Sequence, residues 1–414
     1  MQRVDIKITQ QEQILRDLHH QIVKKNHQSP KIKNYLILLK EYFTDSLFLL
    51  KKFGFKKFFN FWYTKFFIVD EGGEFDLNRR RIRKNPHIVK KTTKIELEIT
   101  TVCNKKCVLC SHTYWNYKQE HMSFEKFKKI LDDIPSLRWI NLAGIGSNML
   151  NKDYIKMLEY ASAKNLNVNI VDEFEFLDEA KARKIIELGI NSIYVSFDAA
   201  KKETYEKMKK GCDYDQFMTN LKTLIALKEE MKSPFPVLHF RFIIHKENYD
   251  QISEYIDLVS SLRPRGIRAR VEFIGVIVFE NNKKYAMPIE EVPFEIKKDV
   301  YEKALNYGIN LNFSHASVSK PSINSCIRWA EPFILVSGEV IPCCSILLQS
   351  KRDFLKKYSL GNVFKRTFYD IWNDKKYKEF RVQVLDSKAK VPTICKYCCS
   401  HDHQERAAKY GYSE

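Results

Sequence analysis

Cys103, Cys107 and Cys110 form a CxxxCxxC set directly after a strand-like run at residues 95–100. Three thiolates on one short loop can hold three irons of a [4Fe-4S] cluster. Such clusters are normally ligated by four cysteines, so the fourth iron would be left open for another ligand. Zinc and unrelated thiols are the alternatives, and the spacing favours the cluster.

A second set of cysteines lies near the end of the chain. Cys326, Gly338 and Cys343 follow a C-x11-G-x4-C pattern, and Cys395 and Cys398 form a CxxC pair. These four thiols suffice for one [4Fe-4S] cluster in which every iron is ligated.

Neighbouring residues leave other assignments of this second set open. Cys344 and Cys399 are alternatives to Cys343 and Cys398, although the spacing favours the latter two. Zinc is the alternative to iron, because four cysteines, or three with a histidine, make a tetrahedral site. The histidines that could complete it are His401 and His403.

The composition is typical of a globular protein with two or three domains. The chain has 414 residues, of which 44% are hydrophobic, and this length exceeds a single-core domain. No uncharged apolar run reaches the roughly eighteen residues of a membrane span, and the first residues do not resemble a signal peptide. We therefore expect a cytoplasmic protein whose cysteines bind metal rather than form disulfides.

The N-terminal part is basic and rich in aromatic residues. Residues 1–94 hold 21 Lys and Arg against 9 Asp and Glu, so most of the net charge of +19 lies there. Aromatics and lysines interleave between residues 42 and 69. This segment could cap the fold with its aromatics buried, lie on a membrane surface or stack on RNA. In the last two cases, residues 42–94 would form the contact with a membrane or with nucleic acid. A membrane contact would place the protein at the inner membrane surface.

The middle of the chain alternates strand-like and helix-like segments. Repeated βα units imply a parallel sheet with right-handed crossovers, and ligands of such sheets lie at the carboxyl ends of the strands. The loop of Cys103 follows the first strand at that end. The predicted strands are 95–100, 139–143, 167–171, 192–197, 238–244 and 270–274, and the predicted helices are 123–134, 152–164, 178–188, 214–231 and 249–262.

From about residue 93 to residue 400 the chain resembles radical S-adenosylmethionine (SAM) enzymes with a SPASM-type C-terminal extension. The resemblance rests on both cysteine sets and on the segments 192–198, 361–363 and 370–373. It implies an α/β fold, a (β/α)6 partial TIM barrel, whose [4Fe-4S] cluster binds SAM through the open iron. It also implies a second, auxiliary [4Fe-4S] cluster and an external electron donor such as ferredoxin or flavodoxin.

We therefore predict three parts of the chain. Residues 1–92 form a basic helical N-terminal extension, residues 93–310 the radical SAM partial barrel, and residues 311–414 a small cysteine-rich SPASM/twitch-like domain. The last part shows little regular secondary-structure pattern.

The predicted SAM-binding residues follow the family motifs with departures. Gly144 and Gly146 lie in the run after the second strand, where Ser147 replaces the glutamate that usually receives the SAM amino group. A hydroxyl can still accept a hydrogen bond, but charged hydrogen bonds are about twice as strong as neutral ones. Asp172, or Glu173 beside it, is predicted to compensate for the lost acid.

The fourth and fifth strands supply further candidates. The resemblance places Ser196 at the SAM ribose with Asp198 beside it, and the alternative for both is a strand end and a helix cap. His239 and Arg241 share one face of the fifth strand and are the predicted catalytic residues. Other candidates for substrate contact are His245, Arg270 and Glu272.

Three functions remain open. The first is an enzyme that cleaves SAM reductively to a 5′-deoxyadenosyl radical, which abstracts hydrogen from a substrate, with an auxiliary cluster that relays electrons or binds substrate. The second is an iron–sulfur electron-transfer or binding scaffold with a degenerate SAM site. The third is a basic metal-binding protein that contacts RNA, which explains the charge but neither the βα units nor the cysteine spacing.

Overall fold

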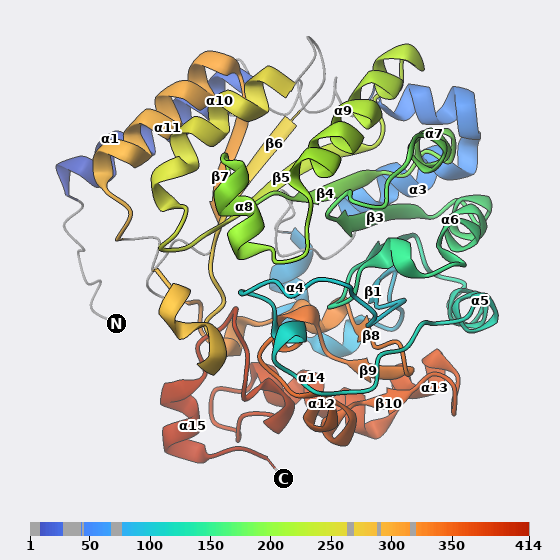
Figure 1. The fold of residues 1–414 in the computed structure, drawn as a ribbon. Helices are drawn as coiled ribbons and strands as arrows, with labels where there is room; N and C mark the ends of the chain where they lie inside the picture. The colour runs from blue at the N-terminus through green and yellow to red at the C-terminus, as the bar shows by residue number, and fades with distance from the viewer. Residues whose placement is uncertain are drawn as a thin grey trace.

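The computed structural model describes residues 9–27, 43, 45–67, 77–262, 269–287, 291–314 and 320–413. Across these residues ten strands form one sheet in the order β10-β9-β8-β1-β2-β3-β4-β5-β6-β7 (Figure 1). Each neighbouring pair from β1 to β7 is parallel. These strands are β1 (Lys94–Leu97), β2 (Trp139–Leu142), β3 (Asn167–Asp172), β4 (Ser192–Ser196), β5 (Val237–Ile244), β6 (Ala269–Gly275) and β7 (Asn310–Ser314).

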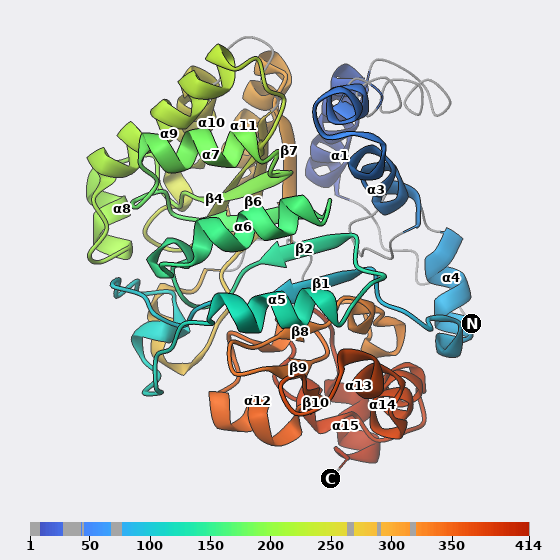
Figure 2. The same ribbon diagram turned by 90° about the vertical axis from the view of Figure 1, so that its right-hand side faces the viewer.

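The sheet curves as a partial barrel, and helices cover the outer face of these strands (Figures 1 and 2). The six predicted strands and five predicted helices are confirmed, with ends shifted by a few residues; the sequence did not predict β7, α8 or α11. Ser123 caps α5, because its side chain accepts a hydrogen bond from the backbone amide of Lys126. The helices are α5 (Phe124–Asp132), α6 (Tyr154–Ala163), α7 (Glu179–Glu187), α8 (Lys202–Met208), α9 (Tyr214–Glu230), α10 (Ile252–Leu262) and α11 (Phe294–Tyr307).

The C-terminal part continues the main sheet. β8 (Phe333–Ile334) pairs in parallel with β1, and β9 (Glu339–Ile341) turns back antiparallel to β8 and pairs with β10 (Gly361–Asn362). The hairpin between β8 and β9 turns at Gly338, whose φ of 92° favours glycine. The C-terminal elements therefore lie as a layer beside β1 (Figure 2).

The expectation of little regular structure after residue 311 is wrong. Four helices in the described residues of this part are short and lack a long apolar periodicity. Two of them begin at side-chain caps, since Thr367 caps α13 and Asp374 caps α14. Buried Trp372 holds α13 in the layer, since its indole donates to the carbonyl of Val89 at 3.3 Å. The helices are α12 (Arg352–Tyr358), α13 (Phe368–Asn373), α14 (Lys375–Leu385) and α15 (Gln404–Tyr410).

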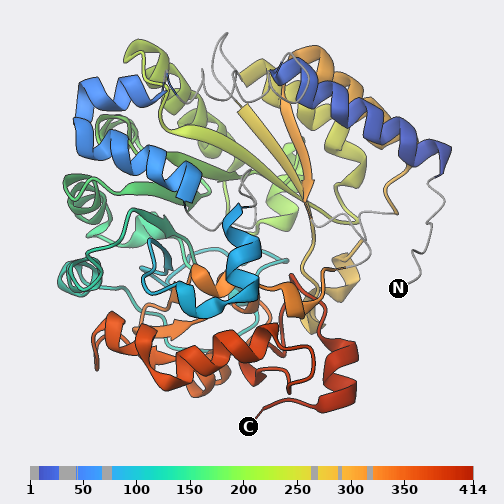
Figure 3. The same cartoon turned by 180° about the vertical axis from the view of Figure 1, so that it is seen from behind.

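The N-terminal helices pack on two sides of the barrel. α1 (Gln10–His27) lies against α11 and β7 (Figure 3), where it covers the edge strand of the sheet. α4 (Leu77–Lys84) lies near the C-terminal layer. No helix in the described part of the chain is both long and apolar enough to cross a membrane.

α3 (Phe55–Phe67) divides its aromatic residues between the interior and the surface. Phe61 packs in a cluster with Leu49 and Phe235, as expected for a cap that buries aromatics. Phe55 and Phe59 are 68% and 47% exposed. Residues 42, 44 and 68–76 of the predicted contact segment lie outside the described residues, and its contact with a membrane or nucleic acid stays a prediction.

Lys57 fixes α3 to the barrel and gives the fold a pH dependence. Its ammonium is buried and donates to the carbonyl of Leu166, and burial lowers its pKa to about 7. Between about pH 7 and the unfolded pKa of about 10.4 the unfolded chain holds a proton that the folded chain lacks. The free energy of unfolding therefore rises with pH in this window.

We expect Lys57→Met to remove this contribution, about 3 kcal/mol between pH 7 and 9.5. Urea unfolding at both pH values measures it, with Lys56→Met at the exposed neighbouring lysine as the control. Equal pH dependence in Lys57→Met and the wild type would contradict the assignment.

Candidate active site

The loop of Cys103, Cys107 and Cys110, hereafter the cysteine loop (residues 103–110), follows β1 at the carboxyl edge of the sheet (Figure 1). Its backbone is fixed from two sides. Lys106 and Val108 donate to the carbonyls of Lys210 and Met208 at 2.8 and 2.9 Å. On the other side, the amide of Ser147 donates to the carbonyl of Val102 at 2.9 Å. The loop is therefore held between the segments that follow α8 and β2.

The three thiols of the cysteine loop are partly buried and close enough to influence one another. Burial raises the pKa of Cys103 to about 11, and it also raises the pKa of Cys110. A hydrogen bond with Cys212 raises the pKa of Cys107. Within the described residues, no three His, Cys, Asp or Glu side chains lie close enough together to hold a metal ion as they stand. The soft thiol donors fit an iron–sulfur cluster, which binds them as thiolates.

Gly144 and Gly146 allow the segment after β2 to cross the end of β1. A Cβ atom at Gly144 would lie 2.6 Å from Cγ of Glu98, and one at Gly146 would lie 2.5 Å from the carbonyl oxygen of Thr100. Any larger residue would displace the backbone here. The two glycines thus bring Ser147 beside the cysteine loop, where its Oγ donates to Oε1 of Glu173 at 2.6 Å.

Asp172 and Glu173 have different surroundings. Asp172 is buried, its Oδ1 accepts from the amide of Phe174 at 2.6 Å, and burial raises its pKa. Glu173 reaches Ser147, and its negative charge raises the pKa of Cys103 and Cys110. The geometry gives Asp172 the role of a turn cap. Glu173 is the acid beside the cysteine loop, and the sequence offered it only as an alternative.

Ser196 and Asp198 lie at the end of β4, and their contacts favour the structural alternative. Oδ1 of Asp198 accepts from the amide of Ile243 at 2.9 Å, and its Oδ2 lies 3.2 Å from Nζ of Lys209. Lys209 also donates to the carbonyl of Ser196 at 2.5 Å. The predicted contact of Ser196 with the SAM ribose stays a prediction.

Lys209 and Cys212 lie beside the cysteine loop without having been singled out as site residues. The buried ammonium of Lys209 lowers the pKa of Cys107 and Cys110, opposing the effect of burial. Cys212 hydrogen-bonds with Cys107. Both residues follow α8, and their nearness to the loop comes from the pairing of residues 208–210 with residues 106–108. No local sequence pattern predicts that pairing.

His239 and Arg241 lie on one face of β5, as predicted, next to polar residues of neighbouring strands. The rings of Tyr194 and His239 are 4.6 Å apart, and the guanidinium of Arg241 lies 3.9 Å above the ring of Tyr194. Nε of Arg241 lies 2.8 Å from Oε2 of Glu272 on β6. The sheet register thus brings these four side chains together, and a role in catalysis remains a prediction. His245, by contrast, is buried, which lowers its pKa to about 4.

The second cysteine set converges in the C-terminal layer. Burial raises the pKa of Cys343 and Cys395, and each is raised further by the charges of Cys326 and Cys398. All four thiols therefore lie near one another, although residues 326 and 398 are far apart in sequence. Four thiols are the number of donors that a [4Fe-4S] cluster needs, and ligation by these four stays a prediction.

The structure separates these cysteines from their sequence neighbours. Burial and the carboxylate of Glu96 raise the pKa of Cys344, so Cys344 points toward β1. Sγ of Cys399 lies 3.8 Å from Oγ of Ser400. Among the candidate zinc ligands, Nδ1 of His403 lies 3.1 Å from the hydroxyl of Tyr412. The surroundings favour Cys343 and Cys398 as the ligands.

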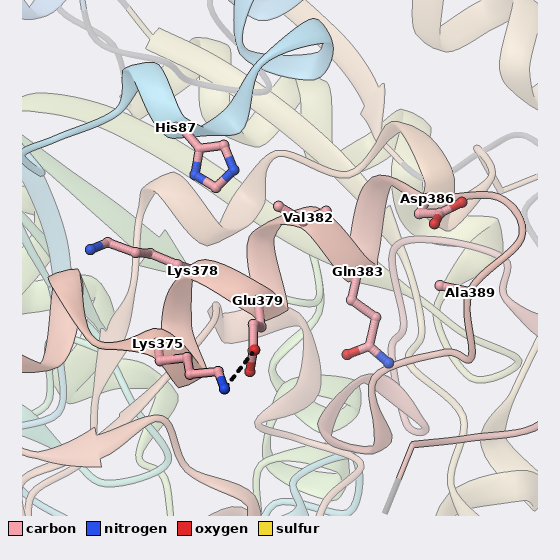
Figure 4. Close-up of a pocket in the computed structure, with 8 residues that line it drawn as sticks. All are labelled: His87, Lys375, Lys378, Glu379, Val382, Gln383, Asp386 and Ala389. Atoms are coloured by element: carbon pink, nitrogen blue, oxygen red, sulfur yellow. Dashed lines mark ion pairs between the residues drawn. The ribbon is translucent and has the colours of Figure 1, made fainter.

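A separate open depression of about 510 Å³ lies between residues 86–88 and α14 (Figure 4). Lys375 and Glu379 form an ion pair of 3.7 Å in it. It contains no predicted site residue, and we assign it no function. The lining residues are His87, Lys375, Lys378, Glu379, Val382, Gln383, Asp386 and Ala389.

Comparison with known proteins finds a family match for each of the two segments that contain the cysteine sets. Residues 97–259 match the model of the radical SAM superfamily, and residues 326–399 match that of the SPASM iron–sulfur cluster-binding domain. The tungsten-containing aldehyde ferredoxin oxidoreductase cofactor-modifying protein of Pyrococcus furiosus is 26% identical over 309 residues, which cover 69% of this chain and 82% of that protein. The PqqA peptide cyclase of Rhizobium meliloti is 23% identical over 312 residues, which cover 73% and 78%.

A solved structure shares the fold. SuiB of Streptococcus suis superposes with a TM-score of 0.57 at 15% identity, over 90% of this chain and 92% of that one. The chain thus carries a radical SAM domain over residues 97–259 and a SPASM domain over residues 326–399. The radical SAM domain binds a [4Fe-4S] cluster and SAM, and the SPASM domain binds auxiliary iron–sulfur clusters.

Proposed function

We propose that the protein is a catalytic radical SAM enzyme with one auxiliary cluster. When bound, the reduced cluster at the cysteine loop supplies one electron that cleaves SAM to methionine and a 5′-deoxyadenosyl radical, which abstracts hydrogen from the substrate. A ferredoxin or flavodoxin is the proposed electron donor. The observation that carries the proposal is the cysteine loop, held at the carboxyl edge of the sheet between the segments after α8 and β2, with the acid Glu173 beside it.

The chain's own residues hold the reactants in this proposal. Cys103, Cys107 and Cys110 ligate the SAM-binding cluster, and the glycines after β2 let the backbone approach it. His239 and Arg241 contact the substrate or SAM inside the barrel. We also propose that the barrel ends near residue 310 and that residues 311–414 form the auxiliary domain.

The auxiliary cluster is proposed to relay electrons rather than bind substrate. Its ligands are Cys326, Cys343, Cys395 and Cys398, and four thiolates leave no iron open for a substrate. The substrate class stays open between a peptide and a cofactor precursor, since the relatives' names include a peptide cyclase and a cofactor-modifying protein.

The test is the formation of 5′-deoxyadenosine by anaerobically purified, cluster-reconstituted protein with SAM and dithionite. We expect product from the wild type and none above background from the Cys103/Cys107/Cys110→Ala variant. No product from wild type with full iron content and intact cluster spectra would favour the non-catalytic scaffold. Candidate substrates should then be added to exclude a strict need for substrate.

A further inference from the structure

The resemblance to radical SAM enzymes implies an acid after the second strand that receives the SAM amino group, and this chain has no acid there. Ser147 stands at that position, and its side chain is buried. If the proposed function is correct, SAM binds beside the cysteine loop and its amino group needs another acceptor. A hydrogen bond to a charged acceptor contributes more binding free energy than one to a hydroxyl.

Glu173 brings a carboxylate to the same place from the next strand. Its Oε1 accepts from Oγ of Ser147 at 2.6 Å, while the amide of Ser147 is bonded to Val102, the residue before Cys103. One residue therefore links the carboxylate to the start of the cysteine loop.

The turn that carries Glu173 is built to hold it there. Phe174 has a φ of +64°, which is costly for a bulky residue. Its amide donates to Asp172 at 2.6 Å, and its carbonyl accepts from Nδ2 of Asn220 at 2.7 Å. The ring of Phe174 is buried against Phe217, with centroids 6.0 Å apart. Strain that the surroundings maintain in this way is a mark of functional positions.

We propose that Glu173 accepts a hydrogen bond from the amino group of SAM, and that Ser147 orients its carboxylate. The carboxylate of the SAM site then comes from the residue after β3 instead of from the loop after β2. Ser147 is then a positioning residue. Its small side chain leaves room for the Glu173 carboxylate, which a glutamate at position 147 would crowd.

The experiment compares SAM binding in anaerobic, cluster-reconstituted variants that match the wild type in iron content and cluster absorption. Titration calorimetry gives the Kd for SAM, and the EPR spectrum of the reduced cluster reports whether SAM reaches the iron. We expect Glu173→Gln to weaken SAM binding by about 10- to 100-fold. At saturating SAM the EPR spectrum of its reduced cluster should still change, and this change should be reduced less than the affinity for SAM. The control, Glu179→Gln at an exposed acid on α7, should bind like the wild type.

A second variant tests the relocation directly. Ser147→Glu combined with Glu173→Ala returns the acid to its usual position, and we expect it to bind SAM within about tenfold of the wild type. Wild-type binding by Glu173→Gln would overturn the inference. If Glu173→Gln does not load the cluster, a loaded double variant that fails to bind SAM would overturn it. Failure of the wild type itself to bind SAM would instead reject the proposed function.

Discussion

Arg352→Met is expected to destabilise the protein by about 3–5 kcal/mol, because it leaves the carboxylate of Glu98 buried without its partner. Glu98, the residue directly after β1, is fully buried, and Arg352, at the start of α12, is 8% exposed. Oε2 of Glu98 also accepts from the amide of Val336 at 3.2 Å. The ion pair thus joins the first barrel strand to the C-terminal layer. The measurement is the urea midpoint at equal iron content.

Two controls separate the buried charge from a loss of packing. The double variant Glu98→Gln/Arg352→Met removes both charges, and we expect it to recover most of the lost free energy. Arg366→Ala breaks an exposed pair with Asp374 of 2.6 Å and should cost less than about 1 kcal/mol. A loss below 1 kcal/mol in Arg352→Met would show that this ion pair is not essential to the stability of the fold.

Cys343→Ala is expected to remove about four of about eight irons per chain, because it takes away one ligand of the auxiliary cluster. Cys344→Ala, at the adjacent residue, should retain them, since its thiol lies near Glu96. Cys398→Ala and Cys399→Ala form a second matched pair with the same expectation. Iron content and the EPR spectra of the reduced proteins measure the outcome.

The same preparations decide between iron and zinc. One zinc per chain, lost in Cys343→Ala while the other cluster remains, would support a tetrahedral structural site and contradict the auxiliary cluster. Equal iron loss in Cys343→Ala and Cys344→Ala would contradict the assignment of ligands. Because electrons must reach the SAM-binding cluster from a donor, a protein without the auxiliary cluster also tests the relay.

The sequence by itself determined the features that depend on local spacing. Cys103, Cys107 and Cys110 are close in the chain, so their spacing predicts a common ligand whatever the rest of the fold. The alternation of apolar runs predicted the parallel sheet, because periodicity reflects which face of each segment is buried. The parallel sheet in turn placed the cysteine loop at the carboxyl edge.

Only the tertiary structure decided which of two neighbouring residues faces the site. Adjacent residues on an extended chain point to opposite sides, so a turn of one residue exchanges Asp172 with Glu173, or Cys343 with Cys344. The sequence contains both members of each pair, and their contacts in the fold distinguish them. Glu173 bonds to Ser147 whereas Asp172 caps its own turn, and Cys344 lies near Glu96. The fold alone also revealed two further sets of contacts. They are those of Lys209 and Cys212 with the cysteine loop, and the ion pair of Glu98 with Arg352. Their contacts join residues distant in sequence, and no local periodicity records such contacts.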